Sequence, residues 1–181
     1  MRVTATMNTA LFVDITNLYH CISREYGGRR LDYQKLYDFA WELTGNTGIL
    51  RAFAYGGQIA DEATLFINAL RDIGYEPKYR QHKLGDDNKI VRKVDWDVGL
   101  TMDVVKLSTK ITTAIVASSD PDLIPVYLWA KSVGIRIVVI ACGVPREVRE
   151  IADRWFEIPM ELLEAYNPDL APRLSEEPTL Q

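Results

Sequence analysis

The chain has 181 residues and a formal net charge of −4, from 21 Lys and Arg against 25 Asp and Glu. This length suits one domain that buries its own core, and 48% apolar with 25% charged residues excludes a disordered or collagen-like protein. The negative charge argues against coating of DNA through bulk positive charge, but it allows a nucleic-acid enzyme with a local basic patch.

Five segments are predicted to be strands because they are short, apolar and mostly rich in β-branched residues. They cover residues 10–14, 49–55, 75–81, 113–117 and 135–140. The segment 75–81 is the weakest, and Pro77 favours a place at the edge of the sheet, since proline cannot donate to a ladder.

Between the strands, apolar residues recur at the spacing of amphipathic helices. We expect helices at 36–43, 59–73, 98–107 and 123–130. The alternation of strands and helices indicates right-handed crossovers and a mainly parallel sheet covered on both faces. The chain is therefore predicted to form one three-layer α/β domain over residues 8–165, with a proline-rich tail over 166–181. No apolar run reaches about 18 residues, so no membrane-spanning helix is expected.

Aspartates follow two of the predicted strands at the end where open parallel sheets bind ligands. Asp14 closes the first strand, and Asp120 and Asp122 follow the strand 113–117. If these two strands are neighbours, the carboxylates meet in one crevice. Carboxylates held close together repel one another, and such a cluster normally needs a cation, for which oxygen ligands favour Mg²⁺ or Mn²⁺.

Further polar residues belong to the same crevice. Asp95 and Asp97 precede the helix that leads into strand 113–117, and Asn17 comes one turn after the first strand. Ser118 and Ser119 add hydroxyl groups. A metal-activated water that attacks a phosphodiester is the chemistry that such a site supports.

Each carboxylate also has a purely structural explanation. Asp120 and Asp122 suit the start of a helix, Asp97 suits the cap of the next helix, and Asp14 suits an Asx turn. The coincidence of their places favours a shared site, because independent helix caps need not gather at one edge of two adjacent strands. The role of Asp103 is undecided, since a surface ion pair with Lys106 explains its presence equally well.

Basic residues bracket these acids along the chain. Candidate contacts to a nucleic-acid strand are Lys78, Arg80, Lys83, Lys89, Arg92 and Lys93. Tyr79 among them is placed to stack on a base, and the loop 85–93 is expected to lie over the crevice. Ordinary solvated charge explains the same residues equally well.

Cys21 and Cys142 lack a CxxC spacing, and only His20 and His82 could complete a zinc site with them. We therefore expect reduced cysteines in the cytoplasm, with His20 and Cys21 serving in packing.

Three ordered motifs make the chain recognisable. Residues 13–18 resemble the pattern D-x-x-N-L, residues 93–103 resemble K-x-x-D-V-x-L-x-x-D, and residues 117–125 resemble S-G-D-x-D-F-x-P. A later stretch, 151–156, resembles A-D-x-F. Together they resemble the NYN domain family, also described as LabA-like proteins, a branch of the PIN-like nucleases.

This resemblance implies a PIN-like Rossmannoid fold with a five-stranded, mainly parallel sheet in the order 3-2-1-4-5. It implies metal-dependent endoribonuclease activity on RNA, with single-stranded RNA as the expected substrate and a homodimer left open. The implied catalytic residues are Asp14, Asn17, Asp97, Asp120 and Asp122, of which the four aspartates would hold Mg²⁺ or Mn²⁺. Ser118 and Ser119 join the basic residues above as candidate RNA contacts.

Two departures from the family pattern are visible: Ser119 replaces the usual Gly, and Leu123 replaces the usual Phe. Neither change removes a carboxylate. The alternative is a catalytically idle NYN-like module that binds RNA or a protein, but such a module need not keep four carboxylates. A small-molecule phosphatase ranks last, because residues 14–16 lack the D-x-D pattern of haloacid-dehalogenase-like enzymes.

Overall fold

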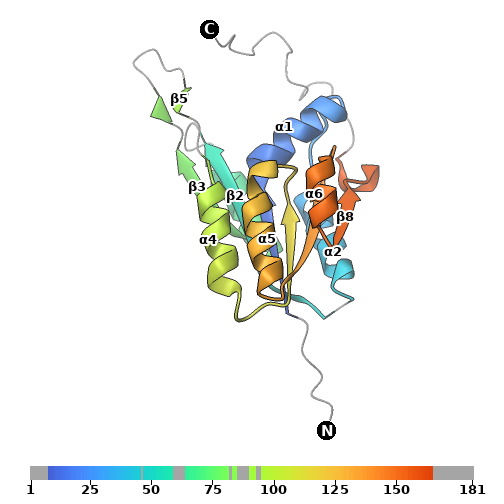
Figure 1. Cartoon of the computed structure of the whole chain (residues 1–181). Coiled ribbons are helices and arrows are strands. Elements are labelled where there is room, and N and C mark those ends of the chain that lie inside the picture. Colours follow the sequence, from blue (N-terminus) through green and yellow to red (C-terminus); the bar gives the residue numbers. More distant parts are fainter. Residues whose placement is uncertain are drawn as a thin grey trace.

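The computed structural model describes residues 8–45, 47–58, 64–81, 83–84, 90–92 and 95–164. Over these residues the chain forms a three-layer α/β domain with a central parallel sheet (Figure 1). The predicted fold class is thereby confirmed. The predicted tail, 166–181, lies outside the described residues, so the boundary at 165 stays a prediction.

The main sheet has six strands in the order β3-β2-β1-β6-β7-β8. They are β1 (Thr9–Asp14), β2 (Ile49–Gln58), β3 (Glu76–Gln81), β6 (Thr113–Ala117), β7 (Arg136–Ala141) and β8 (Arg154–Glu157). A separate antiparallel pair joins β4 (Lys83–Leu84) to β5 (Ile90–Arg92), so part of the predicted loop 85–93 is a strand. Residues 85–89 and 93 lie outside the described part of the chain.

The sheet therefore has one strand more than the predicted order 3-2-1-4-5. The extra strand, β8, pairs with β7 at the edge and leaves most of its side chains exposed. Only four residues long, it lacks the buried apolar run by which the other strands are identified in the sequence.

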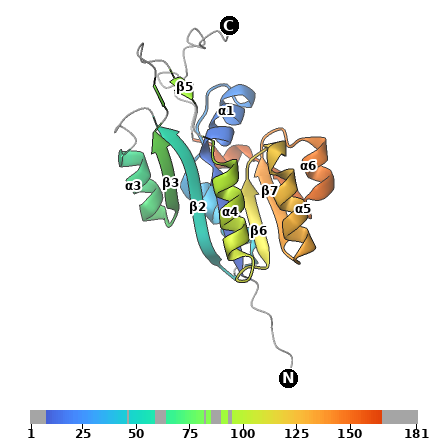
Figure 2. The ribbon, with the colours of Figure 1, turned by 60° about the vertical axis from the view of Figure 1, so that its left-hand side comes forward.

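Helices cover both faces of the sheet (Figure 2). On one face are α1 (Ile15–Glu25), α2 (Tyr33–Leu43) and α3 (Thr64–Ile73), and on the other are α4 (Asp97–Leu107), α5 (Ile124–Ser132) and α6 (Arg146–Ile151). The described residues also include two short 3₁₀ helices, η2 (Pro121–Leu123), just before α5, and η3 (Met160–Leu162). The four predicted helices correspond to α2, α3, α4 and α5, although residues 59–63 of the second lie outside the described residues. No described helix has the length and apolar character needed to span a membrane.

The strand order reverses between β1 and β6, which are hydrogen-bonded neighbours. Val13 of β1 stands opposite Ala117 of β6, and both strands are buried on both faces. Asp14 and Ser118 therefore leave the sheet at the same level. In an open parallel sheet this switch point is the expected place for a ligand.

The first helix, α1, is tied to the far half of the sheet. Cys21 forms a disulfide with Cys142 at the end of β7, with 6.1 Å between their Cα atoms, and the Tyr26 hydroxyl donates to the Ile158 carbonyl oxygen (2.9 Å). The expectation of two reduced cysteines is thus not met in the structure. Sequence spacing could not reveal the pair, because it depends on α1 reaching the end of a strand much later in the chain.

Candidate active site

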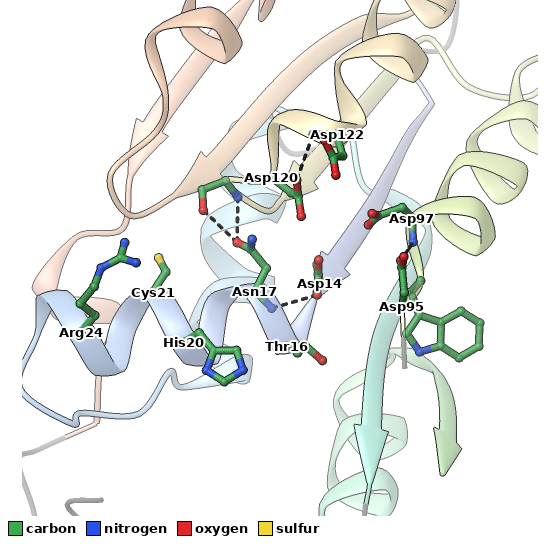
Figure 3. A pocket seen from close by; sticks show the side chains of 12 residues that line it. Asp14, Thr16, Asn17, His20, Cys21, Arg24, Asp95, Asp97, Asp120 and Asp122 are labelled. Carbon is green, nitrogen blue, oxygen red and sulfur yellow. Dashed lines mark hydrogen bonds between the residues drawn. The ribbon is translucent and has the colours of Figure 1, made fainter. Parts of the chain in front are cut away.

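A pocket of about 430 Å³ opens at the carboxyl ends of β1 and β6 (Figure 3). Its lining combines an acidic group with polar residues of α1. The lining residues are Asp14, Thr16, Asn17, His20, Cys21, Arg24, Asp95, Trp96, Asp97, Ser119, Asp120 and Asp122. The structure therefore brings together all five residues that the resemblance implied as catalytic.

Asp14 caps a helix and also lines the pocket. It is the N-cap of α1, because its Oδ1 accepts the backbone N–H of Asn17 (3.0 Å). Its Oδ2 lies 3.5 Å from the Ser118 hydroxyl, which donates to it. Burial raises the pKa of the Asp14 carboxyl, the Asn17 N–H partly offsets this rise, and the charge of Asp120 adds to it. Capping and membership of the site are therefore compatible.

Asp120 likewise begins a helix while it lines the pocket. Its Oδ1 accepts the backbone N–H of Asp122 (2.9 Å), as the capping interpretation predicted. Its own N–H donates to the hydroxyl of Ser118 (3.2 Å). Ser118 thus contacts both Asp14 and Asp120, and it fixes the spacing between the loop after β6 and the end of β1.

Asp97 is not the cap of its helix. The backbone N–H of Asp97 donates to the Asp95 carboxylate (2.8 Å), so Asp95 satisfies the start of α4 and the Asp97 side chain lines the pocket. Burial and then the charges of Asp95, Asp120 and Asp14 raise the pKa of Asp97 to about 6. This mutual repulsion links carboxylates from three separate segments.

Asn17 is oriented by Ser119. Its Oδ1 accepts two hydrogen bonds, from the backbone N–H and from the hydroxyl of Ser119, each 2.9 Å long. A backbone N–H can only donate, so the accepting atom must be oxygen, and the identity of the amide Nδ2 follows. Within the described residues no partner is seen for its two donor hydrogens, which can therefore serve the pocket.

Comparison with known families matches the NYN domain to residues 8–159. The chain belongs to the NYN domain family. Among solved structures, a protein of unknown function from Vibrio parahaemolyticus is similar, with a TM-score of 0.77 and 21% sequence identity. The match covers 91% of this chain and 100% of that one, and it shows a shared fold. Comparison with curated proteins gave no match.

The second acidic position of the NYN-like segment, Asp103, lies away from the pocket. Its buried carboxylate accepts a hydrogen bond from the Tyr55 hydroxyl (2.9 Å) and pairs with Lys78. Lys106 is a more distant partner at 3.6 Å. The surface pair considered from the sequence therefore exists, but the closer contacts of Asp103 are to the sheet, between α4 and strands β2 and β3.

The candidate RNA contacts are placed unequally. The Arg80 guanidinium lies over the ring of Trp96, 4.4 Å from its centroid, and Trp96 lines the pocket. Lys78 faces Asp103 instead. Ser118 is fully buried and acts within the protein, while Ser119 is partly exposed in the pocket. Lys89 and Lys93 lie outside the described residues, and only the backbone of Lys83 and Arg92 is described, so these four stay predictions.

Several lining residues were not expected at the site, namely Thr16, His20, Cys21 and Trp96. Most of them lie on α1, where positions 17, 20, 21 and 24 share one helical face. This spacing was the available signal, but nothing in the sequence showed which face of α1 turns to the crevice. Trp96 depends on Gly99, since a Cβ there would lie 2.6 Å from the indole ring.

The donor set suits a hard divalent cation. The acidic wall offers carboxylate oxygens, which bind Mg²⁺ or Mn²⁺ in preference to softer metals. Beneath it, the buried Tyr127 hydroxyl has no hydrogen-bond partner among the described residues. Burial, followed by the charges of Asp120, Asp14 and Asp97, raises the pKa of this hydroxyl. In the part of the chain that the structure describes, no three His, Cys, Asp or Glu side chains already form a metal cage.

Proposed function

We propose that this NYN domain is a metal-dependent endoribonuclease that hydrolyses single-stranded RNA. The observation that carries the proposal is the meeting of Asp14, Asp97, Asp120 and Asp122 in one pocket at the switch point of the sheet. Burial, followed by the charges of Asp95, Asp120 and Asp14, raises the pKa of Asp97 to about 6. The acidic side chains therefore repel one another in the metal-free pocket. A cation relieves that repulsion.

The four aspartates would hold Mg²⁺ or Mn²⁺, which when bound supplies an activated water and stabilises the leaving oxygen. The protein's own contribution is to place groups around the phosphate. Ser118 holds Asp14 and Asp120 at a fixed spacing, and Asn17 presents donor hydrogens that suit a phosphate oxygen. The side chains of Ser118 and Asn17 are already in place before the substrate reacts, so these groups need little rearrangement during the reaction.

On the other side of the acids, Arg80 and Trp96 suit an RNA strand. A guanidinium stacked on an indole keeps its outer N–H groups available for a phosphate, and the tryptophan offers an aromatic surface to a base. We include Arg80 and Ser119 as RNA contacts, and Lys83, Lys89, Arg92 and Lys93 as further candidates. Lys78 is left out, because its ammonium group is paired with Asp103.

The test is cleavage of labelled single-stranded RNA by the purified protein with Mn²⁺, with and without a chelator, and with single-stranded DNA in parallel. Asp14→Asn and Asp120→Asn should each lower the rate at least a hundredfold, in the range found when one electrostatic group of an active site is removed. Asp72→Asn, an exposed residue of α3, is the matched control and should behave as wild type. Equal activity in all three variants would contradict the site.

The alternative is a module that binds RNA or a protein without catalysis. It is favoured by the absence, among the described residues, of three metal-binding side chains already arranged as a cage. RNA binding without cleavage under any divalent metal would establish it.

A further inference from the structure

The pocket is longer than the acidic centre requires. One wall carries the aspartates, and the other runs along α1 through Asn17, Cys21 and Arg24 (Figure 3). Asn17 and Arg24 are seven residues apart, which is two helical turns or about 10 Å along the helix axis. The acidic group thus occupies one end of the pocket and a cation stands at the other.

Arg24 has unused donors at that end. Its side chain is 71% exposed, and its Nε donates to Glu25 (2.8 Å), the one partner recorded for it among the described residues. An arginine has five N–H donors, so the two terminal nitrogens stay available. Figure 3 shows the guanidinium on the same side of α1 as Asn17.

The helix that carries Arg24 is held firmly. The contact between Tyr26 and Ile158 and the disulfide at Cys21 fix α1 on both sides of Arg24. Asp14 caps the first turn of the same helix. The distance between the acidic centre and Arg24 is therefore set by a rigid element, as a binding site with two anchor points requires.

We propose that Arg24 binds a backbone phosphate of the RNA strand other than the one being cleaved, so that the pocket selects polynucleotides over isolated phosphodiesters. This inference rests on the proposed ribonuclease function. The strand would cross the acidic centre and continue along α1. Phosphates of a stacked strand recur about every 3.4 Å along the axis, so Arg24 reaches a phosphate about three nucleotides from the one at Asn17.

Substrate length provides the first test. Arg24→Ala should raise KM for a short single-stranded oligoribonucleotide about tenfold, the low end for a hydrogen bond to a charged group, with kcat little changed. The same variant should hydrolyse bis-p-nitrophenyl phosphate, which has a single phosphate, as wild type does. Arg71→Ala is the matched control, since Arg71 lies in the last turn of α3 and does not line the pocket.

Salt dependence provides a test without catalysis. In an Asp120→Asn background with chelator present, oligoribonucleotide affinity is measured by fluorescence anisotropy at several salt concentrations. Removing one phosphate contact lowers the slope of log K against log salt by about 0.7 for a single strand. Arg24→Ala should show this loss and Arg71→Ala should not.

Unchanged KM and unchanged salt slope in Arg24→Ala would overturn the proposal. An equal loss on the oligoribonucleotide and on the single phosphodiester would also overturn it, because Arg24 would then act on the whole site. If the wild type cleaves neither substrate with Mn²⁺, the ribonuclease function fails, and the salt slope alone decides whether Arg24 binds the strand.

Discussion

The backbone N–H of Asp97 donates to the carboxylate of Asp95 over 2.8 Å, which places two acidic side chains together at the start of α4. Asp95 therefore completes the helix, and its charge raises the pKa of its neighbour in the pocket. This relationship gives the site a pH dependence that can be measured directly.

Metal affinity should increase with pH through about 6, because a carboxyl must lose its proton before it binds a cation. Titration of Mn²⁺ by calorimetry at several pH values would show this midpoint. Asp95→Asn keeps an acceptor for the Asp97 N–H but removes the charge, so it should move the midpoint to lower pH. A midpoint that does not move would show that Asp95 has no influence on Asp97.

Stability should change with pH in the metal-free protein. Folding raises the pKa of the Asp97 carboxyl from 3.8 to about 6. The contribution of this carboxyl to the free energy of unfolding is therefore fully present below pH 3.8 and is lost as pH rises through about 6. At pH 7.5 in chelator, Asp97→Asn should raise Tm by about 2 to 4 °C, after allowance for solvent screening. Its activity should be lost.

Asp153 is a control for Asp97, because its pKa is shifted in the opposite direction. Its hydrogen bonds with Lys131 and with the Ile137 N–H hold its pKa below the usual value despite some burial. Its contribution to stability is therefore present above about 3.8 and is lost as pH falls below that value. At pH 7.5 Asp153→Asn should lower Tm, and a rise in both variants would contradict the electrostatic explanation.

We expect replacement of Asp103 to lower the free energy of unfolding and to leave the rate of RNA cleavage unchanged. Replacing it with Ala leaves Lys78 without its partner and the Tyr55 hydroxyl without an acceptor, at a cost of about 2 to 4 kcal/mol. Denaturant unfolding measures this loss, and RNA cleavage per folded molecule should be retained. A folded Asp103→Ala protein without activity would show that Asp103 takes part in catalysis.

Two tyrosines give a matched comparison of buried hydroxyl groups. Tyr55→Phe removes a hydrogen bond to Asp103 and should lower the free energy of unfolding by about 1 to 3 kcal/mol, as for a bond to a charged group. Tyr127→Phe removes a hydroxyl that has no hydrogen-bond partner in the described part of the chain, so the metal-free protein should keep or gain stability. Equal losses in the two variants would show that the Tyr127 hydroxyl has a partner in solution.

The hydroxyl of Ser119 should contribute to the rate through Asn17. Ser119→Ala keeps the backbone hydrogen bond and removes the second one, so Asn17 becomes less well oriented. We expect kcat to fall about two- to tenfold, as for a hydrogen bond of ordinary strength, with Tm little changed. Asn17→Ala should cost more, and a Ser119→Ala rate equal to wild type would show that the backbone bond suffices.

The sheet and the acidic centre could be predicted because both follow from short patterns. Buried strands have continuous apolar runs, and Asp14 and Asp120 come directly after two of them. Once β1 and β6 were taken as neighbours, the carboxylates had to meet. Asn17 was predicted from its place one turn after the first strand, and Asp97 from its place before the helix that leads into β6. The family motifs supported both residues.

The missed features depend on contacts between distant segments. Cys21 lines the pocket because α1 crosses toward β7, and an amphipathic pattern does not show the direction of a helix. The charge of Lys78 predicts an RNA contact, but in the structure its ammonium group pairs with the Asp103 carboxylate. A short edge strand such as β8 has too few buried residues to be recognised.

The pairing of Val13 with Ala117 has a consequence for how this protein tolerates insertions and deletions. Successive side chains of a strand point to opposite faces, so loss of one residue within β1 or β6 would turn Asp14 or Ser118 away from its neighbour. The sheet could still form if the shortened strand shifted its register by one residue. Such a protein would fold without a working centre, whereas lengthening the connections at the opposite end of the strands would leave the centre intact.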